Sequence, residues 1–114
     1  MIKILDLEEV GRKIFKANGL PAVLDSINVE LTGWLGYYSE QIIRLDINEA
    51  VFHHNTKGEG EEKLSDKTVE SLWKITEEGQ DQTRTKQTLK FLEKAMSNIK
   101  ASIRRAETES RNLT

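Results

Sequence analysis

Three residues with metal-ligating side chains share one side of a long predicted helix. Asp46, Glu49 and His53 are three and four residues apart, a spacing at which helical bundles present carboxylates and imidazoles to a di-metal site. Such a site needs several further ligands from other helices. Because the chain has only two histidines and no cysteine, we predict no metal site. We interpret His53 and His54 as a solvated helix end, where histidine also suits the helix dipole.

No spacing typical of a catalytic site occurs in the chain. The G-x-S-x-G and H-E-x-x-H patterns are missing, and Gly58-Glu59-Gly60 lacks the lysine that a phosphate-binding loop would show. The absence of cysteine excludes disulfides, thiolate zinc sites, iron–sulfur clusters and cysteine nucleophiles. We therefore predict a protein that is not an enzyme and that has no catalytic residues and no cofactor.

Basic residues gather at the C-terminal end of a chain whose net charge is only −2. Residues 80–114 carry 8 basic and 4 acidic side chains. Five of these basic residues fall at outward positions of the last predicted helix: Lys90, Lys94, Arg104, Arg105 and Arg111. They could follow a phosphate backbone, as in a nucleic-acid-binding accessory factor of recombination or replication. The other interpretation is a solvated helix face with cations near its C-terminus.

Two glycines and three aromatic residues share one short helical segment. Gly33 and Gly36 each cost about 0.5–1 kcal/mol in a helix interior. We therefore expect close approach of another backbone, a bend or break in the helix, or contact with a ligand. Trp34 and Tyr38 are four residues apart and are predicted to lie in the core. Tyr37 points towards the glycine side and is the better interface candidate, because tyrosine is a favoured interface anchor.

The elements that must position these residues are predicted to be helices. Proline occurs once, and the alternation typical of strands is scarce. A D-x-x-E start signal predicts a helix over residues 6–18, which Gly19 ends. Its apolar stripe is Leu7, Val10, Ile14 and Phe15. Pro21 then opens a long helix over residues 21–54.

The long helix is apolar on two sides. Its main stripe consists of Leu24, Ile27, Leu31, Trp34, Leu35, Tyr38, Ile42, Leu45 and Phe52. The opposite side carries Val29, Gly33, Gly36, Ile43, Ile47 and Val51. Because a helix apolar on two sides usually packs between neighbours, we expect a homodimer, a higher oligomer or a different protein partner. The candidate contact residues are Gly33, Gly36, Tyr37, Ile43, Ile47 and Glu49. Glu49 falls within the main stripe, where it either pairs with a basic residue of a partner or marks the end of the stripe.

The second half of the chain is more polar. Residues 55–64 are predicted to be a mobile loop, since residues 55–63 contain no apolar side chain and two glycines. Ser65 caps a short helix whose predicted buried face is Val69, Leu72 and Trp73. A last helix over residues 80–111 has a heptad seam, namely Leu89, Leu92, Met96, Ile99, Ile103 and Ala106.

Two resemblances suggest function. Residues 73–79 (WKITEEG) resemble the segment that follows the recognition helix of winged-helix regulators, although the preceding helix–turn–helix is missing. Residues 29–41 (VELTGWLGYYSEQ) and 92–102 (LEKAMSNIKAS) are similar to small helical proteins from bacteriophage early or recombination gene clusters. The second resemblance implies a phage-encoded accessory protein in the cytoplasm of a bacterial host.

These patterns predict one all-α domain over residues 1–114. We expect a helical hairpin or bundle with two long antiparallel helices, one end of which is closed by the two short helices. No apolar run approaches the roughly 18–20 residues of a membrane helix, so no membrane partner is expected. The leading function is a non-enzymatic protein that binds or inhibits a host or phage protein. A self-assembling structural bundle is a further alternative.

Overall fold

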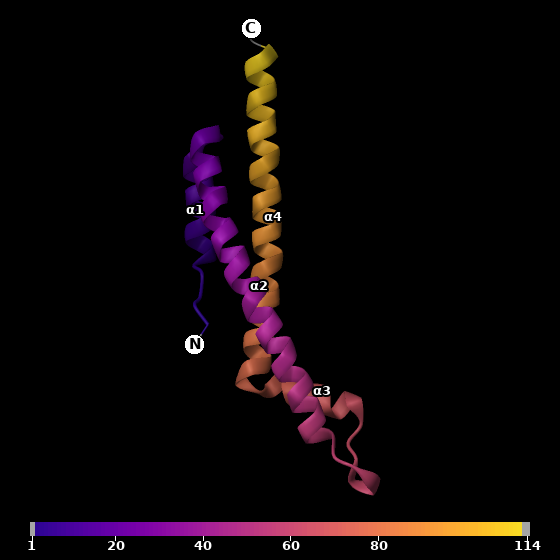
Figure 1. Ribbon diagram of the computed structural model, residues 1–114. Coiled ribbons are helices and arrows are strands. Elements are labelled where there is room, and N and C mark those ends of the chain that lie inside the picture. Colours follow the sequence, from indigo (N-terminus) through magenta and orange to yellow (C-terminus); the bar gives the residue numbers. More distant parts are fainter. Residues whose placement is uncertain (1, 113–114) are drawn as a thin grey trace. The chain divides into compact units, whose positions relative to one another are not determined.

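The computed structural model describes residues 2–112. This part of the chain contains no strand, and its helices are α1 (Leu7–Ala17), α2 (Pro21–Lys57), α3 (Asp66–Ile75), α4 (Glu77–Asn112) and the short 3-10 helix η1 (Gly60–Glu62) (Figure 1). The predicted fold class is confirmed, because two long helices run antiparallel and the other helices are short. Among residues 2–112, no helix combines the length and the apolar character needed to cross a membrane. The ends of the predicted 1–114 domain, Met1, Leu113 and Thr114, lie outside the described residues.

Helix α1 begins and ends at the predicted signals. The carboxylate of Asp6 accepts the backbone N–H of Glu9 at 3.1 Å, which makes Asp6 the N-cap. At the other end Asn18 adopts the left-handed conformation, with a φ of 49°, and Gly19 follows with a φ of 75°. Two left-handed residues in succession turn the chain sharply, and α2 then starts at Pro21.

Helix α2 is continuous and longer than predicted. It ends at Lys57 instead of residue 54, and it passes through Gly33 and Gly36 without interruption. The predicted alternative of a break at these glycines is therefore wrong.

The connection from α2 to α3 is held at both ends. The first residues of the segment predicted to be a loop belong to α2, and residues 60–62 form η1. The Nζ of Lys57 lies 2.6 Å from an Oδ1 of Asp66, and the backbone N–H of Leu64 donates to the carbonyl oxygen of Lys57 at 2.8 Å. Ser65 then caps α3, as predicted.

Helices α3 and α4 meet at Thr76. Its hydroxyl donates to the carbonyl oxygen of Trp73 at 2.6 Å and accepts the backbone N–H of Gly79 at 3.0 Å. One side chain thus closes α3 and caps α4, which starts at Glu77 instead of residue 80. In a winged-helix regulator the segment after the recognition helix leads into the β-strands of the wing. Residues 77–79 instead begin helix α4, so the interpretation as a winged-helix regulator is wrong.

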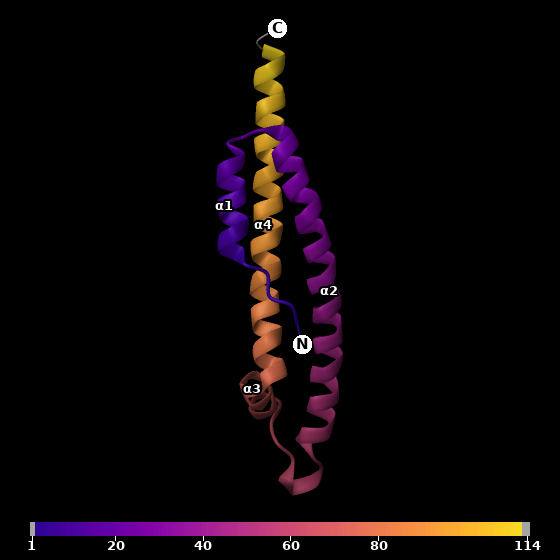
Figure 2. The ribbon, with the colours of Figure 1, turned by 90° about the vertical axis from the view of Figure 1, so that its left-hand side faces the viewer.

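The contacts divide the chain into two compact units. The first contains residues 3–37 and the described part of residues 90–114, that is, α1, the first part of α2 and the last part of α4 (Figure 2). Its core consists of Val10, Ala17, Leu24, Ile27, Leu31, Leu92, Ala95 and Ile99. Helix α1 lies in this unit, where it runs antiparallel to the adjoining part of α2.

The second unit contains Ile2 and residues 38–89, the latter forming the rest of α2, helix α3 and the start of α4. Its buried residues are Tyr38, Leu45, Val69, Trp73, Gln82 and Thr85. Since α1 and α3 belong to different units, the expectation that both close the same end is wrong.

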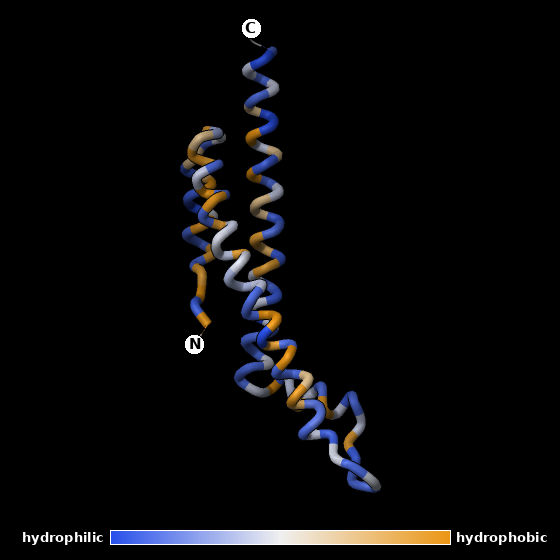
Figure 3. The backbone as a smooth tube through the Cα atoms, in the orientation of Figure 1, coloured by the Kyte–Doolittle hydropathy of each residue, from blue (hydrophilic) through white to orange (hydrophobic). Residues whose placement is uncertain are grey.

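Most predicted core positions face the interior. All nine residues of the main α2 stripe are buried or half-buried. In the α4 seam Leu92 and Ile99 are buried and the other four are half-buried, while Ala95 is buried in addition. Two expectations are wrong, because Phe15 is 86% exposed and Leu72 also lies at the surface. Hydropathy colouring shows how few apolar positions α4 offers compared with α2 (Figure 3).

Candidate functional site

A row of apolar side chains on α2 is exposed in the second unit. Ile43, Ile47 and Val51 expose 61%, 59% and 53% of their surfaces. Their four-residue spacing places them within about 80° of one another around the helix axis. We call these three residues the α2 ridge. Two of them, Ile43 and Ile47, are predicted partner-binding residues.

Packing on the other side of α2 holds the ridge outward. Leu45 is buried and lies about 200° around the helix axis from both Ile43 and Ile47. Further along the same side, the ring of Phe52 packs on Trp73 with the centroids 5.4 Å apart. Burying this side leaves the ridge no partner within its own unit.

A buried glutamine fixes the rotation of α2 more tightly than apolar packing alone would. Gln82 of α4 is 6% exposed, and its Oε1 accepts the indole N–H of Trp73 at 2.7 Å. Its Nε2 donates to Asp46 at 2.8 Å and to Glu49 at 3.3 Å. The amide therefore joins α2, α3 and α4 of the second unit. Bonds to carboxylates are stronger than neutral ones, so a rotation of α2 that buried the ridge would break them.

Sequence reasoning missed this polar layer. Residues 76–88 contain no apolar side chain, yet Gln82 and Thr85 are buried there. The hydroxyl of Thr85 donates a hydrogen bond to the carbonyl oxygen of Asp81, one turn earlier in the same helix, at 2.7 Å. The methyl group of Thr85 is therefore free to pack. The available signal was the length of the polar run, because a helix that packs along such a stretch must bury some polar side chains.

Glu49 lies away from the ridge, in a pocket of about 450 Å³. Asp46 and His53 line the same pocket, together with Lys74 and Lys86. Among residues 2–112 no group of three histidine, cysteine, aspartate or glutamate side chains is arranged to hold a metal ion. The carboxylate of Glu49, predicted to meet a partner, bonds to Gln82 within its own unit.

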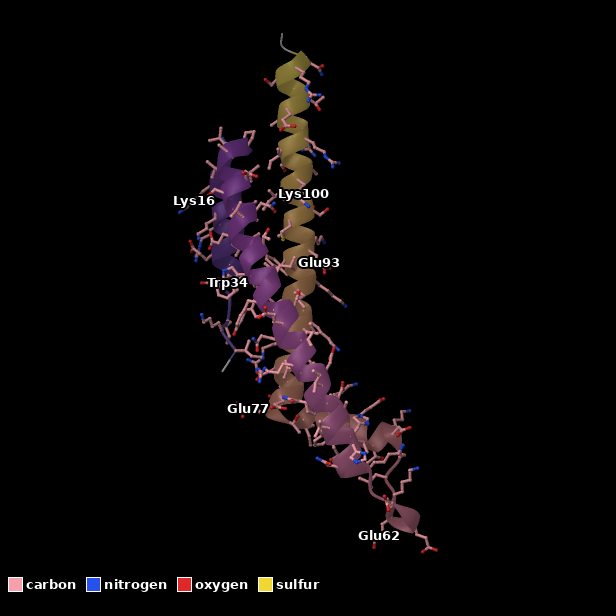
Figure 4. All side chains as sticks on the ribbon, viewed as in Figure 1. Lys16, Trp34, Glu62, Glu77, Glu93 and Lys100 are labelled. Carbon is pink, nitrogen blue, oxygen red and sulfur yellow. The ribbon has the colours of Figure 1, made fainter. Side chains whose placement is uncertain are left out.

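Tyr37 anchors the N-terminal segment in the first unit. Its half-buried hydroxyl accepts the backbone N–H of Lys3 at 2.8 Å, and the Lys3 ammonium lies 5.9 Å from the ring centroid. Trp34, labelled in Figure 4, meets the Tyr37 ring edge-on with the centroids 6.1 Å apart. This predicted interface residue therefore has a structural role within its own chain.

Gly33 and Gly36 lie on the exposed surface of α2. A Cβ atom added at either position would meet nothing within 4 Å. Close approach of another backbone of the described chain is therefore not the reason for these glycines. Contact with another molecule stays a prediction.

The five basic residues predicted to bind nucleic acid are all exposed, and they share the last part of α4 in the first unit. Sequence reasoning missed a concave surface of this unit, a groove of about 550 Å³ between α1 and α2. Lys13 and Glu30 line it and approach to 3.4 Å across it. The groove depends on how two helices pack, which no local pattern encodes.

The predicted partner-binding residues thus occupy several separate places. Ile43 and Ile47 lie on the ridge, Glu49 lines a pocket, and Tyr37 holds the N-terminal segment. The ridge groups two of the predicted contact residues with a further exposed apolar side chain, Val51. Gly33 and Gly36 share their side of α2 with a single exposed apolar side chain, Val29. No protein-family model matches the chain, and neither a curated protein nor a solved structure matches it.

Proposed function

We propose that this protein is a non-enzymatic interaction protein that binds another protein through the α2 ridge. The observation that carries the proposal is the row of three aliphatic side chains, each more than half exposed, on a helix whose rotation is fixed by a buried polar network. Single exposed apolar residues are ordinary, but contiguous apolar patches mark interaction sites.

The size of the ridge indicates the kind of partner. Full burial of one aliphatic side chain is worth about 1.5–3 kcal/mol. The three ridge residues are already partly covered, so complete burial would add about 1–2 kcal/mol each. Since a micromolar complex needs about 8 kcal/mol, the partner must contact the flanks of α2 as well. A partner with an apolar groove fits this requirement.

A second copy of the chain is a weaker occupant. A standard interface buries about 800 Å² on each partner, and two convex ridges of three residues, pressed together, fall well short of that area. The resemblance to bacteriophage proteins favours a phage or host protein in the bacterial cytoplasm as the partner. Self-assembly into a bundle remains the alternative, and the experiment must distinguish it from binding to a different protein.

Site-specific photocrosslinking tests the proposal. A photoreactive amino acid replaces Ile47 in one variant and Ile75, which is 72% exposed at the end of α3, in the control variant. In bacterial host lysate, position 47 should label a discrete protein that position 75 does not label. Excess unlabelled wild-type protein should abolish the adduct, whereas excess Ile43→Glu/Ile47→Glu protein should not. The captured protein is then purified and titrated against both proteins.

Three outcomes of that experiment would contradict the proposal. Equal labelling from both positions, or equal competition by both proteins, would show that the ridge is not the contact surface. Adducts between two copies of this chain, together with a dimer in sedimentation equilibrium at about 50 μM, would establish self-assembly instead.

A further inference from the structure

The first unit presents a second surface, which differs chemically from the ridge. Four basic residues of α4, namely Lys90, Lys94, Arg104 and Arg105, are exposed. At 100° per residue they fall within about 100° of one another around the helix axis. Leu92 and Ile99 lie on the other side of the helix and are essentially completely buried. Packing of the unit therefore holds the four cations outward, and we call them the α4 basic face.

The side chains of the basic face have no partners within residues 2–112. None of the four makes an ion pair or a side-chain hydrogen bond there. Cations elsewhere do make such contacts, as Arg12 does with Glu9 at 2.8 Å and Arg84 with Asp81 at 3.5 Å. When such unpaired cations contact phosphates, the small cations condensed on the nucleic acid are released, and this release supplies a large part of the affinity for nucleic acids.

Acidic residues do not interrupt the middle of this face. Glu93, labelled in Figure 4, lies at its edge, and Glu107 and Glu109 lie about 100° to either side of the helix line through Lys90. Between the cations the face carries the small residues Ser97 and Ala101. The basic face therefore offers charge and small side chains, without a large apolar group along its centre.

The side-chain composition of the basic face favours one class of anionic partner over the others. A protein interface needs apolar or aromatic anchors at its centre, and an amphipathic membrane helix needs large apolar residues to insert. The large apolar residues on the other side of this helix, Leu92 and Ile99, are already used in the core. Lys90 and Arg105 are about 22 Å apart along the axis at 1.5 Å per residue, which suits a regular polyanion.

We propose that the α4 basic face binds the phosphate backbone of a nucleic acid. We expect binding to follow charge and not base sequence, because contacts to phosphates carry no sequence information. With four phosphate contacts, the logarithm of the affinity should fall with the logarithm of salt concentration with a slope of about −3 for a single strand and about −3.6 for a duplex.

Phe91 distinguishes between a single strand and a duplex. It is partly exposed and lies at one edge of the face, next to Lys90 in sequence. Bases of a single strand can stack on such a ring, whereas those of a duplex are already stacked. Phe91→Leu keeps an apolar side chain and removes the aromatic ring. It should weaken single-strand binding about fivefold or more if bases stack there, and leave duplex binding unchanged.

The test is fluorescence anisotropy of the full chain with labelled single-stranded DNA, duplex DNA and single-stranded RNA, from about 30 to 300 mM salt. Three proteins are compared: wild type, Lys90→Glu/Lys94→Glu and the control Lys63→Glu/Lys67→Glu. The control changes the net charge by the same amount at exposed lysines of the second unit. Thermal unfolding confirms that all three proteins are folded.

The expected result is salt-dependent binding by wild type and by the control. The Lys90→Glu/Lys94→Glu protein should bind at least tenfold more weakly, with a salt slope smaller by about 1.4–1.8, because two phosphate contacts are lost. Absence of wild-type binding at 30 mM salt would overturn the proposal. So would equal weakening in the control, or competition by polyglutamate as effective as competition by unlabelled DNA.

Discussion

The backbone of Gly79 packs directly against the carbonyl group of Trp73. A Cβ atom at Gly79 would lie 2.8 Å from the carbonyl carbon of Trp73 and 3.0 Å from the Cα of Lys74, and it would overlap the Trp73 carbonyl oxygen. These neighbours are backbone atoms and cannot swing aside. The tight passage from α3 to α4 therefore requires glycine at this position, although its φ is not left-handed.

Gly79→Ala should destabilise the protein by about 1–3 kcal/mol, the usual cost of forcing an extra methyl group into a packed site. Gly36→Ala is the matched control. Its new methyl group meets nothing within 4 Å, so it should raise stability by about 0.5–1 kcal/mol through helix propensity. Urea denaturation of both variants measures the difference. Equal free energies of unfolding for the two variants would show that the ends of α3 and α4 can move apart at this junction with little loss of stability.

The starts of α1 and α3 were predictable from sequence because capping is local. Asp6 and Ser65 each accept a backbone N–H only three residues further along the chain. Long-range hydrogen bonds give no such signal. Gln82 bonds to Trp73, Asp46 and Glu49 across 9, 36 and 33 residues, so its burial could not be predicted from neighbouring residues.

The predicted interaction residues also divide into those whose position follows from a local sequence pattern and those whose contacts are long-range. Ile43 and Ile47 follow from periodicity, because the burial of one side of α2 places them on the other side. Tyr37 and Glu49 bond to residues 34 and 33 positions away, and those contacts depend on packing. The last helix was predicted to begin at residue 80, and it begins at Glu77. The need for glycine at position 79 arises from its contact with the end of α3, which no neighbouring residue signals.

The bond between Gln82 and Trp73 should show strong coupling in a double-mutant cycle. Gln82→Leu leaves the buried indole N–H of Trp73 without its acceptor, which costs about 1–3 kcal/mol. Trp73→Phe removes the donor. The double variant should lose at least 0.5 kcal/mol less than the sum of the two single variants, since it contains no orphaned donor. Urea denaturation of the four proteins gives these free energies of unfolding, and strict additivity would contradict a direct bond.

The α2 ridge should contribute little to folding. Ile43→Glu/Ile47→Glu should change the free energy of unfolding by less than about 1 kcal/mol, because exposed substitutions usually have effects within about 0.5 kcal/mol each. Leu45→Ala, on the buried side of the same helix, should cost about 2–5 kcal/mol. Both values come from denaturation of the purified protein. Substantial unfolding of the ridge variant would mean that these isoleucines belong to the core and not to a contact surface.

The ion pair between Lys57 and Asp66 should be visible in the titration of the carboxylate. A hydrogen bond from Lys57 and the charge of its ammonium group hold the pKa of Asp66 below its ordinary value of 3.8. A lowered folded-state pKa adds stability that is present above the ordinary value and is lost as the pH falls through the lowered pKa. Lys57→Gln should therefore raise the pKa of Asp66 towards 3.8 and should reduce stability at neutral pH more than at pH values below the lowered pKa. Carboxyl carbon NMR during an acid titration measures the pKa directly. Lys67→Gln, next to Asp66 in sequence but outside the ion pair, should leave it unchanged, and an equal shift in both variants would point to general charge and not to this contact.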